Sequence, residues 1–358
     1  AIFMVAFLPP AFWGAAEPIS HLNDPPGMTG GTAAAAREAM AITMLHWGFH
    51  AWSIYAVCAL VIGYFTFRLG KRSMISTPIR ALLSPGEGKP LLVAADVLGV
   101  VAVIFGLAGS LAQGTLQVRA GLDAQFGLGT TALVSLAILL VLFLAYMTSA
   151  TTGVDKGIRI LSNLNMVIAI ALMAFVIVAG PTRVIFETFV DTLGGYLARL
   201  PEMSFRLYPY EALTSWSASW TLTYLIWWLA WGPFVGIFIA RISRGRTIRE
   251  FMAGVVLVPT AFSVLWFAAF GGAGIFIDLF GPGNLGELVA ENVSEALFLF
   301  FSYFPFTELL TALATLLVFI FLVTSADSGT YVLAMMTTDG DLDPAVGHKW
   351  VWGILVAA

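Results

Sequence analysis

Residues 226–234 read IWWLAWGPF and place Trp227, Trp228 and Trp231 within one short apolar stretch. The stretch lies in the middle of a longer apolar run, 217–240, which contains no Asp, Glu, Lys or Arg. A helix needs about 20 mostly apolar residues to cross the hydrocarbon core of a bilayer. At about 100° per residue the three indoles share one face of a helix. The run therefore predicts a membrane-spanning helix with an aromatic face near its middle.

Six further apolar runs of similar length accompany this one along the 358-residue chain. The chain is 59% hydrophobic and 11% charged, whereas soluble domains are about 45–50% apolar and about 25% charged. This composition predicts an all-α polytopic membrane protein. Partial apolar runs at both ends, 1–15 and 349–358, indicate a single transmembrane domain (1–358) that is a fragment, truncated at both ends. The six other runs are 43–67, 91–118, 130–151, 158–180, 253–279 and 306–336.

The charges between these runs predict an orientation, because short cytoplasmic loops are enriched in Lys and Arg. Residues 68–80 and 241–252 are strongly basic, whereas 280–305 contains Glu and no Lys or Arg. The segment 182–200 has apolar residues near helical spacing and predicts an external amphipathic helix along the membrane surface, with an ordered loop as the alternative. The alternation predicts 68–80, 152–157 and 241–252 inside, and 16–42, 121–129, 181–216 and 280–305 outside. Of the outside segments, 16–42 and 280–303 are expected to be loops.

A second aromatic group occurs in LHWGFHAWSIY, residues 45–55. On one continuous helix, Trp47, Trp52 and Tyr55 would share a broad face. Two aromatic faces on two helices can enclose a site for a cation that cannot donate hydrogen bonds, such as a quaternary ammonium, because ring faces attract cations. Packing between helices is the alternative for both aromatic groups.

Three other polar or helix-breaking patterns are weighed beside the aromatic groups. His46 and His50 have an i, i+4 spacing that can bind a metal, but on the same wheel they point away from the rings and no third ligand is evident. Thr324 and Ser325, in FLVTSADSGT, lie deep in an apolar span, where hydroxyls could bind a cation or join helices. Two proline motifs, Pro9-Pro10 and Gly232-Pro233, are expected to interrupt or loosen their helices.

Five segments, taken together and in this order, resemble the betaine/choline/carnitine transporter family. The resemblance implies a secondary transporter with an inverted-repeat fold of five plus five helices, within a family pattern of about twelve helices. This chain would begin inside the third helix and end inside the eleventh. The segments are FWGAAEP (12–18), MLHWGFHAWSIYA (44–56), GVDKGIRILSNLNM (153–166), WWLAWGPFVGIFIARISRGRTIREF (227–251) and FLVTSADS (321–328).

The resemblance also implies roles for individual residues. The substrate box would consist of Trp47, Trp52, Tyr55 and Trp228, with further pathway aromatics at Trp227, Trp231, Phe12 and Phe234. The hydroxyls of Thr324 and Ser325 would bind a coupling sodium ion. Two departures concern ion binding: VAFLP (5–9) replaces a Gly-rich segment of the family, and Val103 and Leu107 replace the threonines of a second sodium site, with Ser110 retained.

The function expected from the residues and the resemblance is import of a quaternary ammonium compound such as glycine betaine, choline or carnitine across the cell (inner) membrane, by alternating access. Sodium coupling is the favoured energy source, and sodium-independent exchange is the alternative. A homotrimer in the lipid bilayer is expected, without a cofactor or a nucleic-acid partner. An ion channel is disfavoured because no filter-like repeat occurs. An enzyme is disfavoured because no span carries a nucleophile, a base and an orienting acid at suitable spacing.

Overall fold

The chain folds as an all-α polytopic membrane protein. The computed structural model describes residues 10–84, 86–152, 155–341 and 343–358, and this part of the chain contains no β-strand. Within these described residues, seven helical stretches are long and apolar enough to cross a membrane, which confirms the number and order of the predicted spans. They are Ala33–Arg68, Lys89–Phe126, Ala132–Thr152, Ile160–Ala179, Thr214–Ile242, Ile248–Phe280 and Thr307–Thr337.

Most of the described chain is helical, and several spans contain π-helical segments or breaks. The first half contains α2 (Pro10–Asn23), α3 (Ala33–Trp47), α4 (Phe49–Gly63), η1 (Tyr64–Arg68), α5 (Ser76–Arg80), α6 (Lys89–Phe126), α7 (Ala132–Thr152), α8 (Asp155–Ala179) and α9 (Thr182–Ser204). The second half contains α10 (Thr214–Ser217), η2 (Ala218–Leu222), α11 (Thr223–Ile242), α12 (Ile248–Met252), η3 (Ala253–Leu257), α13 (Val258–Phe267), η4 (Ala268–Gly272), α14 (Ala273–Phe280), α15 (Leu285–Glu291), η5 (Val293–Glu295), α16 (Ala296–Phe301), α17 (Thr307–Thr337) and α18 (Val346–Ala357).

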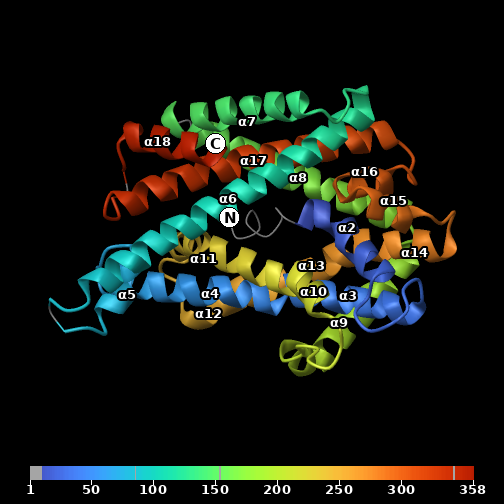
Figure 1. The fold of residues 1–358 in the computed structure, drawn as a ribbon, viewed down its shortest axis with the longest axis horizontal. Coiled ribbons are helices and arrows are strands. Elements are labelled where there is room, and N and C mark those ends of the chain that lie inside the picture. Colours follow the sequence, from blue (N-terminus) through green and yellow to red (C-terminus); the bar gives the residue numbers. More distant parts are fainter. Residues whose placement is uncertain (1–9, 85, 153–154, 342) are drawn as a thin grey trace.

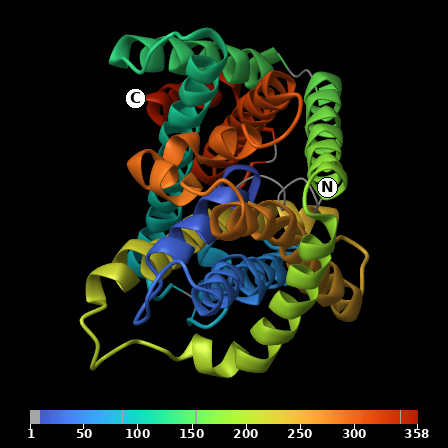
Figure 2. The ribbon, with the colours of Figure 1, turned by 90° about the vertical axis from the view of Figure 1, so that its right-hand side faces the viewer.

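The long helix α6 joins two groups of helices. It packs along α17, whose other neighbours include α7, α8 and α18, and it also contacts α11, which packs along α4. In Figure 1, α7, α17 and α18 lie above, α4, α11 and α3 lie below, and α6 crosses obliquely between them. Figure 2 shows the same two groups from the side, with α9 curving around the lower one. The space between α11 and the helices α6, α8 and α17 contains the candidate site.

Glycines allow the closest approaches between these helices. Gly329 of α17 faces the side chain of Leu107 in α6, and a Cβ atom added at Gly236 of α11 would lie 2.9 Å from Cβ of Cys58 in α4. Small residues let helix backbones approach closely in lipid, where apolar burial gives no driving force between helices. Gly232-Pro233 does not break α11, which continues through both residues to Ile242, although Pro233 has no N–H to donate within the helix.

Two of the predicted outside loops contain helices instead. The expectation of a loop over 16–42 is wrong, because α2 extends to Asn23 and α3 begins at Ala33, where the Thr32 hydroxyl accepts a hydrogen bond from the Ala35 N–H at 3.1 Å. The run Ala33–Ala36 consists of strong helix formers. Likewise, 280–305 forms the short helices α15 and α16. Pro10 begins α2, and Pro9 lies outside the described residues.

The helical stretch Ala33–Arg68 is broken at Gly48, between α3 and α4. Tyr196 of α9 lies at this break: its hydroxyl accepts the Phe49 N–H at 3.0 Å and would lie 2.8 Å from a Cβ atom added at Gly48. Burial raises the pKa of the Tyr196 phenol to about 12, so the phenol stays neutral. The segment 182–200, predicted to be helical, lies within α9. An ion pair between Arg199 and Glu38 at 2.7 Å links α9 to α3.

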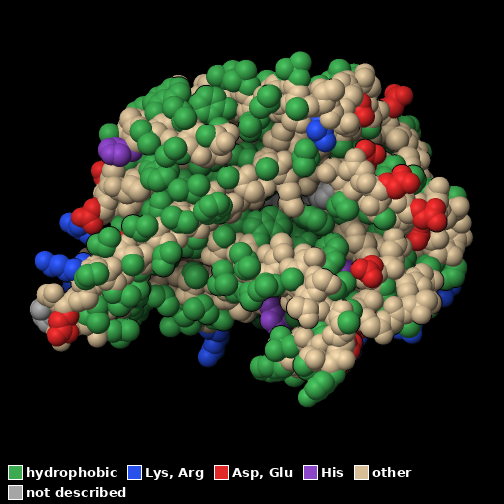
Figure 3. Space-filling view, in the orientation of Figure 1, with side chains coloured by type: hydrophobic (Ala, Val, Ile, Leu, Met, Phe, Trp, Pro, Cys, Tyr) green, Lys and Arg blue, Asp and Glu red, His purple; other side chains and the backbone are tan. Residues whose placement is uncertain are grey.

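The charged side chains are distributed unevenly over the molecule. Figure 3 shows a group of Lys and Arg side chains at the left end, where α5 lies in Figure 1, together with some Asp and Glu. Further Asp and Glu side chains lie along the right edge, where α14, α15 and α16 lie. The assignment of the basic end to the cytoplasm stays a prediction.

Candidate functional site

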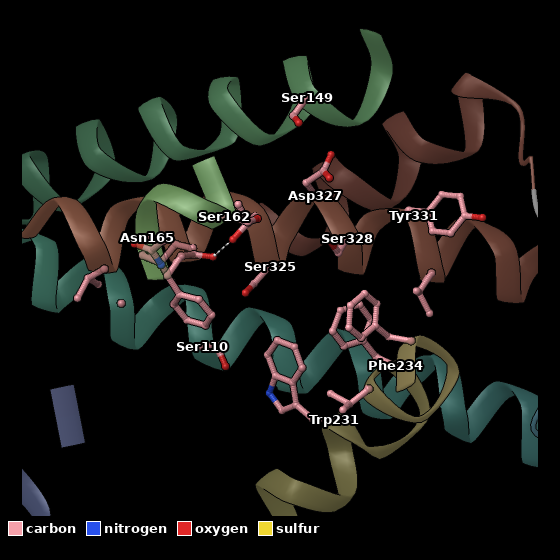
Figure 4. Close-up of a pocket in the computed structure, with 18 of the residues that line it drawn as sticks. Ser110, Ser149, Ser162, Asn165, Trp231, Phe234, Ser325, Asp327, Ser328 and Tyr331 are labelled. Carbon is pink, nitrogen blue, oxygen red and sulfur yellow. Dashed lines mark hydrogen bonds between the residues drawn. The ribbon is translucent and has the colours of Figure 1, made fainter. Parts of the chain in front are cut away.

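A cavity of about 1020 Å³ lies between α11 and the helices α6, α8 and α17. Its walls combine aromatic rings of α11 with hydroxyl and amide groups of the other three helices. Figure 4 shows Trp231 and Phe234 on one side of this space and Ser325 and Ser328 of α17 on the other. The lining includes Trp13, Tyr55, Ser110, Gln113, Asn165, Trp227, Trp228, Trp231, Phe234, Arg241, Thr324, Ser325, Asp327, Tyr331 and Lys349.

The four rings expected to form a substrate box do meet in space. The ring of Trp228 lies edge-to-face against Trp47, with centroids 5.2 Å apart, and against Tyr55, with centroids 5.3 Å apart. The ring of Trp52 meets Tyr55 at 5.8 Å. Edge-to-face contacts are favourable because the positive edge of one ring faces the negative face of another. In this conformation each of the four rings packs directly against at least one of the other three.

The rings differ in their access to the cavity. Tyr55, Trp227, Trp228, Trp231 and Phe234 line it, whereas Trp47 is 1% exposed, Trp52 is 3% exposed, and neither contributes to the lining. In this conformation Trp47 and Trp52 therefore do not border the cavity. The predicted helical wheel assumed one continuous helix, and the break at Gly48 places Trp47 on α3 and Trp52 and Tyr55 on α4.

Two further aromatic positions extend from the cluster. Trp231 lies edge-to-face against Phe234 at 5.3 Å, and its indole N–H is buried with no hydrogen-bond partner among the described residues. Trp227 stacks against Trp228 at 6.1 Å. Phe12, the remaining predicted aromatic, lies in α2, but its side chain is outside those that the structure describes.

A buried polar network, which the sequence reasoning missed, adjoins the aromatic cluster. Oε1 of Glu17 lies 2.6 Å from Nδ1 of His46 and 3.3 Å from Nε2 of His21. Oε2 accepts hydrogen bonds from the Trp47 indole N–H and from the Tyr224 hydroxyl, both at 2.5 Å. Glu17 and His21 are fully buried. The i, i+4 spacing of Glu17 and His21, within and just after FWGAAEP, was the available signal.

The same atoms raise the question of a metal, because Glu17, His21 and His46 bring three potential ligand atoms within 4.8 Å of one another. Ligand atoms about 2 Å from a tetrahedral zinc ion lie about 3.3 Å apart. The 2.6 Å separation of Glu17 and His46 is shorter and fits a charge-assisted hydrogen bond. His46 and His50, whose spacing was considered and disfavoured as a metal site, have different partners: Nε2 of His50 lies 2.9 Å from the Ser204 hydroxyl.

The predicted sodium pair lies at the cavity wall. Thr324 and Ser325 both line the cavity, and the Thr324 hydroxyl donates to the Phe321 carbonyl at 3.0 Å. The family's Gly-rich segment corresponds to residues 5–9, which lie outside the described residues. Val103 and Leu107 are buried, with Leu107 against Gly329. Apolar side chains at these positions offer no oxygen to a second sodium ion.

The fold is that of a multi-pass membrane protein with a central cavity between two helix groups. The family model for betaine/carnitine/choline transporters matches residues 9–358. The chain therefore belongs to the betaine/carnitine/choline transporter family, as the sequence resemblance indicated.

Individual relatives agree with this assignment. The chain is 43% identical over 350 residues to the glycine betaine transporter OpuD of Bacillus subtilis, covering 97% of this chain and 68% of that protein. It is 42% identical to an ectoine/hydroxyectoine transporter of Virgibacillus pantothenticus, covering 97% and 69% of the two proteins. It is 40% identical to a glycine betaine transporter of Acinetobacter baylyi, covering 97% of this chain and 52% of that protein.

Proposed function

We propose that this protein imports a quaternary ammonium compound of the glycine betaine type across the cell (inner) membrane. The observation that carries the proposal is the cluster of Trp47, Trp52, Tyr55 and Trp228 beside a central cavity. A trimethylammonium group has no N–H to donate, so carbonyl or carboxylate acceptors cannot hydrogen-bond it. Ring faces attract such a cation by about 0.5–2 kcal/mol per contact, and the attraction grows as water is excluded.

The carboxylate of a betaine requires a separate group. The indole N–H of Trp231 is a buried donor beside the cavity, with no partner among the described residues. A buried donor without a partner is unfavourable, so an incoming acceptor gains from satisfying it. We assign Trp231 to the carboxylate and the four-ring box to the ammonium group.

Transport requires the site to be reached from each side in turn, and the distribution of polar groups around the cavity supports an inward-facing arrangement. The cavity extends to Lys349 of α18 and to Arg241, which lies in the segment 241–252 that is predicted to be cytoplasmic. Deeper in the structure, the rings of Trp13, Trp220 and Tyr224 pack against one another at 6.1–6.4 Å. We propose that these rings belong to the closed external side.

We propose sodium as the coupling ion, bound by the hydroxyls of Thr324 and Ser325, and a homotrimer as the assembly in the membrane. The support for sodium is the position of both hydroxyls at the cavity wall, together with the match of TSADS to the family pattern. Sodium-independent exchange is the competing mechanism, since Thr324 also bonds its own helix.

Counterflow of radiolabelled glycine betaine in proteoliposomes tests the proposed function. Vesicles preloaded with unlabelled glycine betaine should accumulate label, because a carrier exchanges substrate across the membrane. Choline, carnitine and ectoine should be compared as competitors, since one relative is named for ectoine. Absence of counterflow with glycine betaine, choline and carnitine would refute a quaternary ammonium carrier, and strong competition by ectoine alone would move the substrate to that class.

A further inference from the structure

Glu17 is a fully buried carboxylate in α2, and the imidazoles of His21 and His46 are two of its hydrogen-bond partners. Removing a carboxylate from water is unfavourable unless hydrogen bonds satisfy its oxygens. Here both oxygens are bonded: Oε1 lies against the two imidazoles, and Oε2 accepts from Trp47 and Tyr224. A carboxylate with this many partners is held in one position.

Three of the four partners of this carboxylate, Trp47, Tyr224 and His46, lead to the aromatic box. Trp47 belongs to the box and meets Trp228 edge-to-face at 5.2 Å. Tyr224 meets Trp47 at 5.3 Å and stacks on the imidazole of His46 at 4.6 Å. The backbone carbonyl of His46 accepts the indole N–H of Trp228 at 2.8 Å. Two of the four box rings are therefore oriented by groups that Glu17 holds.

The network also joins three helices that surround the box. Glu17 belongs to α2, Trp47 and His46 belong to α3, and Tyr224 belongs to α11. The second imidazole nitrogen of His46 lies 3.0 Å from the Thr221 hydroxyl, which precedes α11. Edge-to-face packing depends on ring orientation as well as distance. A shift of the carboxylate would consequently be transmitted to the rings of the box.

We propose that Glu17 is a positioning residue for substrate binding, acting through its hydrogen bonds to Trp47 and Tyr224. It orients the indole of Trp47 and, through His46, the indole of Trp228. The inference rests on the proposed function, because it assigns a role in binding the same quaternary ammonium ligand. Glu17 itself makes no contact with the substrate in this proposal.

The change Glu17→Gln tests this role, because it preserves the shape of the side chain and replaces the charged acceptor by a neutral amide. Hydrogen bonds to charged groups are stronger than neutral ones by about one kcal/mol or more, and about 1.4 kcal/mol corresponds to a tenfold change in affinity. We expect the Kd and the KM for glycine betaine to rise about tenfold, with the maximal uptake rate changed less than twofold.

Glu38→Gln is the matched control, since Glu38 is also a buried glutamate, in α3, and pairs with Arg199 and Arg206 away from the box. It should leave the affinity for glycine betaine within twofold of wild type. An affinity loss in Glu38→Gln equal to that in Glu17→Gln would attribute the effect to general destabilisation and overturn the proposal.

Tyr224→Phe provides the second measurement, because it removes one hydrogen bond to Glu17 and retains the ring. We expect it to weaken binding about threefold, less than Glu17→Gln, because the other three partners still hold the carboxylate. If Glu17 acts through its donors, Glu17→Gln combined with Tyr224→Phe should weaken binding no more than Glu17→Gln alone. Multiplication of the two single effects would overturn the proposal. Should Glu17→Gln not fold, wild-type affinity in both Tyr224→Phe and Trp47→Phe would overturn it equally.

Binding to the purified protein and uptake into proteoliposomes distinguish failure of the positioning role of Glu17 from failure of the proposed transport function. If the wild type binds glycine betaine and Glu17→Gln binds it with equal affinity, only the positioning role is contradicted. A wild-type protein that binds no glycine betaine, choline or carnitine contradicts the proposed function itself, and the positioning role with it.

Discussion

Replacement of Trp228 by alanine should weaken the binding of a quaternary ammonium ligand by removing the ring at the centre of the box. Trp228 contacts both Trp47 and Tyr55 and also lines the cavity. One cation–ring contact contributes about 0.5–2 kcal/mol, which corresponds to a loss of affinity of about 2- to 30-fold. We expect the upper part of this range, since Trp228 is only 7% exposed and water is largely excluded around it.

The same substitution also affects folding, and the two effects must be separated. Removal of a buried Trp side chain costs about 3–5 kcal/mol of stability, and the His46 carbonyl loses its indole donor. Trp228→Phe retains a ring face but loses that donor and part of the buried ring, which together cost about 1–3 kcal/mol of stability. Its affinity should therefore stay within about threefold of wild type, even though its thermal unfolding temperature falls.

Isothermal titration with glycine betaine and uptake in proteoliposomes would measure these effects, with Trp216→Ala as the matched control. Trp216 is 8% exposed and its indole N–H also donates to a backbone carbonyl, that of Asp24, at 3.0 Å. It lies outside the four-ring box. Equal affinity of wild type and Trp228→Ala would refute the assignment of the box, as would an equal loss in Trp216→Ala.

Three further outcomes are expected. Thr324→Ala combined with Ser325→Ala should raise the sodium concentration for half-maximal uptake about tenfold, because a methyl group cannot bind the ion. The Hill coefficient for sodium should stay near one, since Val103 and Leu107 offer no oxygen to a second ion. A cysteine replacing the exposed Lys71, in a Cys58→Ser background, should resist an impermeant thiol reagent added to intact cells, because the basic loop is predicted inside. Gly236→Ala should lower thermal stability by about 1–3 kcal/mol, because the new Cβ would press on Cys58 of α4.

Each of these outcomes has an internal control. Uptake by the wild type that is indifferent to sodium would remove the coupling proposal and favour exchange. A cysteine replacing the exposed Glu287, in the predicted outside segment, should react with the same reagent from outside. Gly109 of α6 has open space around an added Cβ, so Gly109→Ala should be neutral or stabilising by up to about 1 kcal/mol. A destabilisation as large as that of Gly236→Ala would contradict the packing argument.

The membrane spans could be predicted from sequence because their cause is local. An apolar run long enough to cross a bilayer must satisfy its backbone groups internally, and a helix does this within the run itself. Short helices without such a run were harder to recognise. The segment 16–42 was expected to be a loop, and its helices α2 and α3 adjoin the Asn23–Thr32 connection, whose Asn, Asp, Pro and Gly residues dominated the pattern.

The candidate site could be predicted only in part, because its geometry depends on contacts between distant residues. The aromatic residues were recognisable from their number and spacing. The Glu17 network was not, since Glu17 meets partners 29, 30 and 207 positions away along the chain. Helical periodicity carries information about neighbours three or four residues apart, and it contains nothing about which carboxylate faces which indole.

The break at Gly48 explains why the helical wheel identified the box residues and misplaced them. Trp47 precedes the break and is held to α2 by Glu17, whereas Tyr55 follows it on α4, which packs on α11. Trp228 of α11 touches both rings, at 5.2 Å and 5.3 Å. The relative position of the two halves of the box is therefore set by the contacts of two different helices and not by the pitch of one. Consequently, a change in the α4–α11 contact should displace Tyr55 and leave Trp47 in place, whereas a change at Glu17 should do the reverse.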